Sequence, residues 1–244
     1  MPDDHHDQLP FADRADAGRR LARRLEALAG DDPVVVGLPR GGVPVALEVA
    51  LHLGAPLDVV LVRKLGFPFR PEMAMGAIGE DGVRILNQAA VRRARVTDVH
   101  LREIERRERA ELERRVRRFR GDRPRIPLQG RTVVVVDDGL ATGSTARAGC
   151  QVVRALGASR VVLAVPVAPA GWTKEFDGDA DGFVCVATPA PFLAIGQWYL
   201  DFSQTTDQQV CACLDRAAAR PATPSRDAHN GPAPAPSGRP PDGA

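Results

Sequence analysis

The chain has 244 residues, 44% of them hydrophobic, which is enough for one substantial core or at most two small ones. Its formal net charge is only +2, a balance that argues neither for nor against a polyanionic partner. No apolar run approaches the roughly 20 residues of a membrane helix, and the N-terminus lacks the apolar core of a signal peptide. We therefore expect a cytoplasmic protein with no membrane partner.

The four cysteines, Cys150, Cys185, Cys211 and Cys213, lack the spacing of a zinc site. Cys211 and Cys213 lie in a helix-like stretch, in which both side chains cannot converge on one metal. Reduced thiols are the interpretation that this pattern favours.

The first third of the chain predicts one unit of a parallel sheet. Residues 1–10 are polar and indicate a flexible N-terminus, and residues 14–29 have the leucine spacing of an amphipathic helix. A strand at residues 34–38 leads through a glycine-rich loop into a helix that ends at Gly54, and LDVVLVRKLG, residues 57–66, is a second buried strand. Strand, loop, helix and strand make a βαβ unit.

The middle of the chain predicts a hairpin and one long helix. Residues 66–87 hold two alternating runs separated by Glu80-Asp81-Gly82, which is typical of a hairpin. Residues 97–120 combine a thin apolar stripe with glutamates and arginines three or four apart. The interleaved glutamates and the lack of stacking aromatic residues favour a solvated face or a subunit contact over a nucleic-acid patch. We expect no nucleic-acid partner, and a homodimer is possible.

Three further strands, at 132–136, in RVVLAVPVA and in GFVCVAT, complete the expected fold. The fold class is α/β, with a doubly wound, mainly parallel five-stranded sheet flanked by helices and a hairpin and long-helix insertion. Residues 216–244 contain no large apolar residue and predict a disordered tail. The expected domain therefore covers residues 11–215, with the insertion at 66–125.

The stretch VVVVDDGLATGST, residues 133–145, places two carboxylates and a loop of small, hydroxylated residues after a buried strand. Ligands of open α/β sheets bind beyond the carboxyl ends of strands, where a loop enters a helix N-terminus that favours anions. The loop lacks the lysine of a P-loop, and no G-x-G-x-x-G follows a strand. Asp137 and Asp138 suit a phosphate neighbour if sugar hydroxyls lie between, bound directly or through Mg²⁺. A phosphorylated ribose is therefore the predicted ligand.

The same stretch closely resembles the motif with which type I phosphoribosyltransferases bind phosphoribosyl pyrophosphate (PRPP). VVVGLPRGGVPVA resembles their pyrophosphate loop, and VVLVRKLG resembles their second strand. The resemblance covers about residues 12–215 and gives residues 66–125 the place of the mobile catalytic loop, with 66–90 as the candidate lid. It implies a Mg²⁺-dependent transfer of ribose 5-phosphate from PRPP to a purine or pyrimidine base, with release of pyrophosphate.

The resemblance also implies roles for particular residues. The catalytic residues would be Asp137, Asp138, Arg40 and Lys64, and the two aspartates would hold the ribose hydroxyls, in part through Mg²⁺. The 5-phosphate would bind to Gly139, Leu140, Ala141, Thr142, Gly143, Ser144 and Thr145. The pyrophosphate would bind to Arg40, Gly41, Gly42, Arg63 and Lys64.

The acceptor base is left open by two conflicting signals. Ala141 stands where the oxopurine branch of the family carries an aspartate general base, so this position resembles the adenine and uracil enzymes. Residues 188–204 instead resemble the oxopurine segment, by which Phe192 and Trp198 would bind the base and Asp201 would hold a metal. The alternative is that Trp198 packs, with Tyr199 and Phe202, against the sheet.

Two other interpretations are weighed against a transferase. Adjacent aspartates after a strand also occur in phosphoacceptor receiver domains, but GLATGST has no role there. Some relatives bind PRPP as non-catalytic regulators and carry a DNA-binding module. About thirty residues precede the first strand here, without a helix-turn-helix, so the sequence favours an enzyme.

Overall fold

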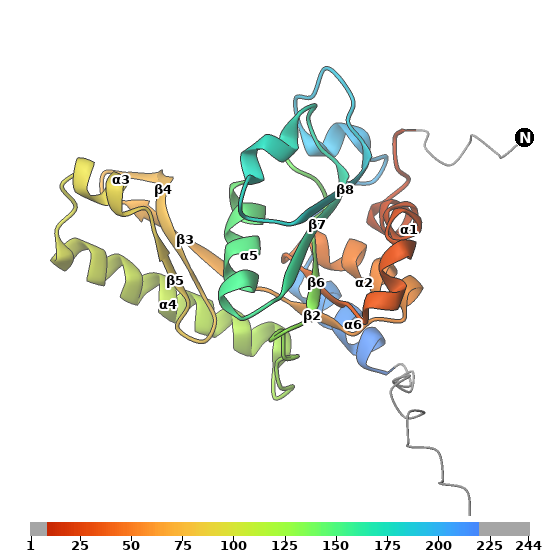
Figure 1. Ribbon diagram of the computed structural model, residues 1–244, viewed down its shortest axis with the longest axis horizontal. Coiled ribbons are helices and arrows are strands. Elements are labelled where there is room, and N and C mark those ends of the chain that lie inside the picture. The colour runs from red at the N-terminus through yellow and green to blue at the C-terminus, as the bar shows by residue number, and fades with distance from the viewer. Residues whose placement is uncertain (1–8, 220–244) are drawn as a thin grey trace, which may run out of the picture.

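The computed structural model describes residues 9–219, whose architecture is a parallel five-stranded sheet with helices on both faces (Figure 1). The strand order is β2-β1-β6-β7-β8, and every neighbouring pair is parallel. The strands are β1 (Val34–Gly37), β2 (Leu57–Val59), β6 (Thr132–Val136), β7 (Arg160–Val167) and β8 (Gly182–Ala187). The expected doubly wound fold is therefore confirmed.

Helices cover each face of this sheet and bury it. One face packs against α1 (Arg14–Arg24), α2 (Gly42–Leu53) and α6 (Asp207–Ala218). The other face packs against α5 (Ser144–Ala155) and the short 3-10 helix η3 (Trp172–Phe176). Two further 3-10 helices are η2 (Glu26–Asp31), where the sequence predicted a continuation of α1, and η4 (Ile195–Trp198). Among residues 9–219, none of the helices has the length and apolarity to cross a membrane.

Strand β6 lies at the centre of the sheet and shows why the sequence around the acidic pair is so apolar. Val134 and Val136 join the core on the α2 side, whereas Val133 and Val135 join the core on the α5 side. All four are fully buried, so both faces of the strand demand apolar side chains. The residues that follow Val136 consequently emerge at the carboxyl edge of the sheet, beside the loop that follows β1.

The insertion forms a regular arm beside α5 (Figure 1). Its antiparallel sheet has the order β3-β4-β5, and the long helix α4 packs against β3 and β4. Its elements are β3 (Val62–Phe67), β4 (Arg70–Gly79), β5 (Arg84–Leu86), α3 (Gln88–Arg93) and α4 (Asp98–Arg120). The hairpin at 80–82 and the helix at 97–120 are confirmed, and residues 62–120 are called the arm below.

The prediction of one continuous strand over residues 57–66 is wrong. β2 ends at Val59, and β3 begins at Val62 in the arm, where it pairs with β4 instead of the main sheet. At the crossing, the Leu61 amide reaches Oε1 of Glu80 in the arm at 3.4 Å. Val59, Val60 and Leu61 are all buried, so the apolar pattern continues across the point where the chain changes sheets.

Arg120, at the end of α4, ties the arm to the main sheet. Its guanidinium binds Asp58 of β2 at 3.2 Å, the Val59 carbonyl at 3.1 Å, and the Glu80 carboxylate in the β4–β5 turn. The three charged side chains are only 7–8% exposed. A buried charge network of this kind fixes the base of the arm.

The predicted terminal segments fall largely outside the described residues. The predicted flexible N-terminus and disordered tail fall mainly on residues 1–8 and 220–244, which lie outside the described residues. Residues 216–218, assigned by the sequence to the tail, belong to α6. Leu9 packs against the cluster that contains Phe11 and Tyr199.

Candidate functional site

Asp137 and Asp138 follow the last residue of β6 and lie against the loop that follows β1. A Cβ atom on Gly41 would lie 2.0 Å from Oδ2 of Asp138, and one on Gly42 would lie 2.8 Å from Cα of Asp137. Only glycine fits such a close approach of two loops. The predicted pyrophosphate loop and the predicted ribose-binding pair are thus brought together.

Arg14 of α1 binds the acidic pair directly. Its Nε donates to Oδ2 of Asp138 at 2.8 Å and its Nη1 donates to the Ser203 carbonyl at 2.7 Å. The guanidinium also lies 4.1 Å from the centre of the Phe202 ring. Sequence reasoning missed Arg14, because one arginine in an arginine-rich amphipathic helix carries no distinguishing signal.

Tyr199 anchors the backbone of the acidic pair. Its hydroxyl donates to the Asp138 carbonyl at 2.5 Å, and its ring is 6% exposed. The alternative in which Tyr199 and Phe202 pack the C-terminal segment therefore has direct support, since their ring centres are 5.0 Å apart. That segment is held to the site at both Arg14 and Tyr199.

The environment of the two carboxylates is short of positive charge. Burial raises the pKa of Asp137 well above its ordinary value, and the neighbouring Asp138 raises it further. Burial also raises the pKa of Asp138, against the opposing effect of Arg14. Hydroxyl donors or a cation from a ligand would supply the stabilisation that the charged pair lacks.

The loop at 139–145 has the geometry of an anion site. Gly143 has φ of 66° and caps α5, and a Cβ there would lie 2.7 Å from Phe176. Leu140 is 3% exposed and its amide is bonded to β7, which fixes the loop backbone. The hydroxyls of Thr142 and Ser144 lie 3.3 Å apart at the helix N-terminus. Free amides and the helix dipole favour an anion at this place.

Lys64 and Arg63, adjacent on β3, have different partners. The Lys64 Nζ donates to the Ser144 hydroxyl at 3.1 Å, so the structure brings this lysine to the loop at 139–145. Arg63 instead donates to Oε2 of Glu108 on α4, at 2.6 and 2.9 Å. Two of the hydrogen-bond donors of Arg63 are thus already occupied by Glu108 and are not free for a ligand.

Arg40, the other predicted pyrophosphate ligand, is exposed in the loop after β1. The peptide bond between Pro39 and Arg40 is cis. The Arg40 guanidinium lies 3.6 Å from Asp207 of α6, with 39% of its side chain exposed. This weak surface pair leaves the guanidinium accessible to a ligand.

The two predicted base-binding rings belong to the C-terminal segment. The centres of Phe192 and Trp198 are 6.3 Å apart, and both rings are partly buried against Phe11 and its neighbours. The indole Nε1 of Trp198 is buried without a hydrogen-bond partner among residues 9–219. The packing and the unused donor are compatible with either role, so base binding stays a prediction.

Of the three predicted metal ligands, Asp137 and Asp138 are adjacent, whereas Asp201 is not grouped with them. Within residues 9–219, no three His, Cys, Asp or Glu side chains are grouped to hold a metal. Asp201 is exposed and accepts from the Ser203 amide at 2.9 Å, so it does not join Asp137 and Asp138 in one cluster. Mg²⁺ commonly takes one or two protein carboxylates and fills its shell with substrate oxygens and water. Asp137 and Asp138 suit that type of site.

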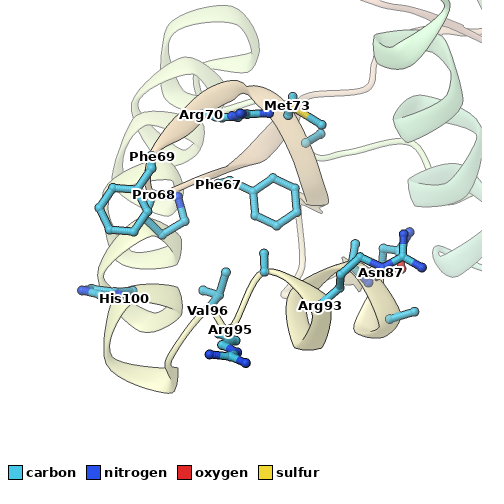
Figure 2. Close-up of a pocket in the computed structure, with 14 residues that line it drawn as sticks. Phe67, Pro68, Phe69, Arg70, Met73, Asn87, Arg93, Arg95, Val96 and His100 are labelled. Carbon is cyan, nitrogen blue, oxygen red and sulfur yellow. Dashed lines mark hydrogen bonds between the residues drawn. The ribbon is translucent and has the colours of Figure 1, made fainter.

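A separate cavity of about 670 Å³ lies in the arm (Figure 2). Phe67 points into the space between the β3–β4 hairpin and α3, and Phe69, which is 89% exposed, lies at its edge. None of the residues predicted for the site lines this cavity.

Comparison with known proteins identifies the family. The profile of the phosphoribosyl transferase domain matches residues 11–189. A Mycobacterium tuberculosis protein of strain H37Rv, Rv0571c, provisionally named a phosphoribosyl transferase, is 59% identical over 207 residues. That match covers 85% of this chain and 47% of the relative, so the chain spans about half the length of such relatives.

A solved structure shows the same fold. The crystal structure of TT1426 from Thermus thermophilus has a TM-score of 0.77 and 46% sequence identity, covering 84% of this chain and 98% of that one. The family profile alone extends over most of the described residues, including the acidic pair and both loops. The chain therefore belongs to the phosphoribosyl transferase family.

Proposed function

We propose that the protein transfers ribose 5-phosphate from PRPP to a nitrogenous base, purine or pyrimidine, and releases pyrophosphate. The observation that carries the proposal is the close approach of the two loops, in which Gly41 has room for no side chain beside Oδ2 of Asp138. The approach brings Asp137 and Asp138 next to Gly41 and Gly42 and to the start of the loop at 139–145, which supports the proposed roles of these residues. A ligand that joins a ribose, a 5-phosphate and a pyrophosphate suits all three.

The reaction uses the residues in distinct ways. A base nitrogen forms a bond to C1 of the ribose as the bond from C1 to the pyrophosphate oxygen breaks. Pyrophosphate leaves with the electron pair, and the proton of the base N–H is released to water. Asp137 and Asp138 hold the ribose hydroxyls, and the loop at 139–145 holds the 5-phosphate. Arg40 and Lys64 stabilise the charge that develops on pyrophosphate.

Magnesium and the remaining partners are part of the proposal. Bound Mg²⁺ would supply positive charge to the pyrophosphate and orient the ribose hydroxyls. Phe192 and Trp198, whose ring centres are 6.3 Å apart, are the proposed contacts of the base. We further propose that the enzyme acts in the cytoplasm with reduced thiols, which agrees with its four free cysteines. A homodimer stays a prediction.

Pyrophosphate release tests the proposal. PRPP and Mg²⁺ are incubated with a panel of purines and pyrimidines, and base-dependent pyrophosphate is measured for the wild type, Gly41→Ala and Gly30→Ala. Gly41→Ala should lose at least about tenfold in rate, because its Cβ meets a carboxylate oxygen at 2.0 Å. Gly30→Ala is the matched control, since a Cβ there meets nothing within 4 Å and its rate should stay unchanged.

The regulator alternative gives a different pattern. PRPP binding without turnover of any base in the panel would support a non-catalytic regulator. The absence of both binding and turnover in the folded wild type would refute the proposal.

A further inference from the structure

We propose that Arg107 and Arg115 of α4 form an anion-binding wall of the active site and that, together with Lys64, they hold pyrophosphate. This inference rests on the proposed function and adds to it residues of the arm, for which the sequence favoured a solvated face or a subunit contact. We call Lys64, Arg107 and Arg115 the cationic wall.

A cavity of about 550 Å³ connects the arm with both predicted phosphate-binding loops. Its lining includes Pro39 of the loop after β1, Lys64 of β3 and Thr145 at the start of α5. From α4 it includes Ile104, Arg107, Glu108 and Arg115. A ligand in this cavity is therefore within reach of the proposed pyrophosphate and 5-phosphate sites.

The lining has a strong excess of positive charge. Its charged side chains are four cations, Arg63, Lys64, Arg107 and Arg115, and one carboxylate, Glu108. Within the described residues, Lys64 has no carboxylate partner. Its Nζ donates to the Ser144 hydroxyl, which leaves its positive charge uncompensated. A cavity of this composition attracts anions rather than a neutral ligand.

Glu108 binds two of the guanidinium groups and neutralises only one of their two charges. It is 9% exposed, and its Oε2 accepts from Arg63 at 2.6 Å while its Oε1 accepts from Arg107 at 3.2 Å. One buried carboxylate thus holds an arginine from β3 and an arginine from α4 at the same cavity. Side chains that are already positioned lose less entropy when they bind a ligand.

Only some of the arginines of α4 face this cavity. Arg114 and Arg115 each pair with Glu111 at 2.8 Å, but Arg115 lines the cavity whereas Arg114 does not. Arg107 lines it, and the preceding Arg106 does not. The helix therefore presents Arg107 and Arg115 to the cavity, whereas Arg106 and Arg114 supply comparison positions that do not line it.

Pyrophosphate is the anion that best fits the chemistry of the wall. Guanidinium groups bind phosphate oxygens through paired, charge-assisted hydrogen bonds. The two linked phosphate groups of pyrophosphate offer enough oxygens to bind several guanidinium groups at once. Apolar residues complete the lining, including Val62, Pro71 and Ile104.

Calorimetric titration of the full chain with sodium pyrophosphate, in the presence of Mg²⁺, tests the wall. The variants are Arg107→Gln with Arg115→Gln and, as a matched control, Arg106→Gln with Arg114→Gln. Both double variants remove two charges from the same helix, and each removes one arginine that pairs with Glu111. The first should weaken pyrophosphate binding at least about tenfold, and the control should change it less than about twofold.

Equal weakening in the two double variants would show a general charge effect of α4 and overturn the inference. No weakening in the first variant, or no pyrophosphate binding by the wild type, would also overturn it. If the glutamine variant fails to fold, Arg107→Lys with Arg115→Lys keeps the charge, and its binding should be weaker than wild type through the lost guanidinium geometry. Unchanged affinity in that lysine variant would then count against the wall.

The wall and the transferase can fail separately. If only the Arg107 and Arg115 variant loses pyrophosphate binding, but the wild type turns over no base, the wall is supported and the proposed reaction is refuted. Base-dependent turnover, with pyrophosphate affinity insensitive to Arg107 and Arg115, would remove the wall and leave the reaction.

Discussion

Arg14 holds three parts of the site together with a single side chain. It joins α1 to Asp138 and to the Ser203 carbonyl, and its side chain and that of Asp138 are each 12% exposed. Removing it leaves two carboxylates with raised pKa values next to each other and without their nearest cation. A buried charge that loses its partner costs far more than an exposed one.

Arg14→Gln should therefore lower the free energy of unfolding by about 3 kcal/mol. Arg19→Gln is the matched control on the same helix, because Arg19 is 55% exposed and lies 3.9 Å from Asp16. Its effect should be no more than about 0.5 kcal/mol. Urea denaturation monitored by circular dichroism measures both, and similar small losses would contradict a stabilising role for the pair.

Cys150 on α5 is protected by burial. Burial raises the pKa of its thiol to about 12, from an ordinary value near 9.0, and Asp179 adds to the shift. At pH 8 the folded protein should hold about a thousandfold less Cys150 thiolate than the unfolded chain. The contribution to stability is complete below about pH 9 and is lost as the pH rises toward 12.

We expect iodoacetamide at pH 8 to leave Cys150 unmodified in the folded protein and to modify it in urea. Peptide mass spectrometry of the two samples measures the difference. Equally fast modification in both would mean that the helix does not shield the thiol.

At the scale of elements, the apolar pattern predicted which segments form strands but not which sheet each strand joins. Residues 57–66 read as one run because Val59, Val60 and Leu61 stay buried while the chain passes from the main sheet to the arm. The partners that mark the break, Glu80 and Arg120, are distant in sequence. Periodicity reports burial, whereas strand pairing depends on contacts between remote segments.

In the site, too, the residues with a local signal were predictable and the residues that act through remote contacts were not. Asp137, Asp138 and the glycines of both loops were predictable, because backbone geometry and ligand chemistry demand those residue types at those places. The packing of Tyr199 was weighed as an alternative, but the bonds of Arg14 and of the Tyr199 hydroxyl to Asp138 were not predictable, since these partners are remote in sequence. A long-range side-chain contact leaves no trace in local sequence.

The Arg120 network makes the attachment of the arm testable. Arg120→Met should cost about 4 kcal/mol of unfolding free energy, because Asp58 and Glu80 are left buried without a cation. Adding Asp58→Asn and Glu80→Gln should restore a large part of the loss, since neutral side chains avoid the uncompensated charge. Arg117→Met, at an exposed position of the same helix, is the control and should have little effect.

Failure of the two neutral substitutions to restore stability would contradict an electrostatic origin of the loss. Thermal or urea unfolding of the four proteins measures all of these effects. The wild type supplies the reference in each case.

At the scale of the whole molecule, a central parallel sheet supplies the acidic pair and both loops, and the arm brings further cations to the same edge. The carboxyl end of β6 and the loops after β1 and β6 meet there because the strands are parallel and adjacent. The arm reaches the edge through Lys64, which binds Ser144, and through the lining shared with α4. The closure of residues 66–90 over bound substrate stays a prediction, and those residues include β4, β5 and the start of α3.

Calorimetric titration with PRPP and Mg²⁺ tests whether this edge of the sheet binds a phosphorylated ribose. The two proteins to compare are the wild type and the double variant Asp137→Asn with Asp138→Asn. The wild type should bind one PRPP per chain, and the double variant, which keeps the shape of the pair but not its charge, should bind at least about tenfold more weakly. Equal affinity in the two folded proteins, or no binding by the wild type, would contradict the account.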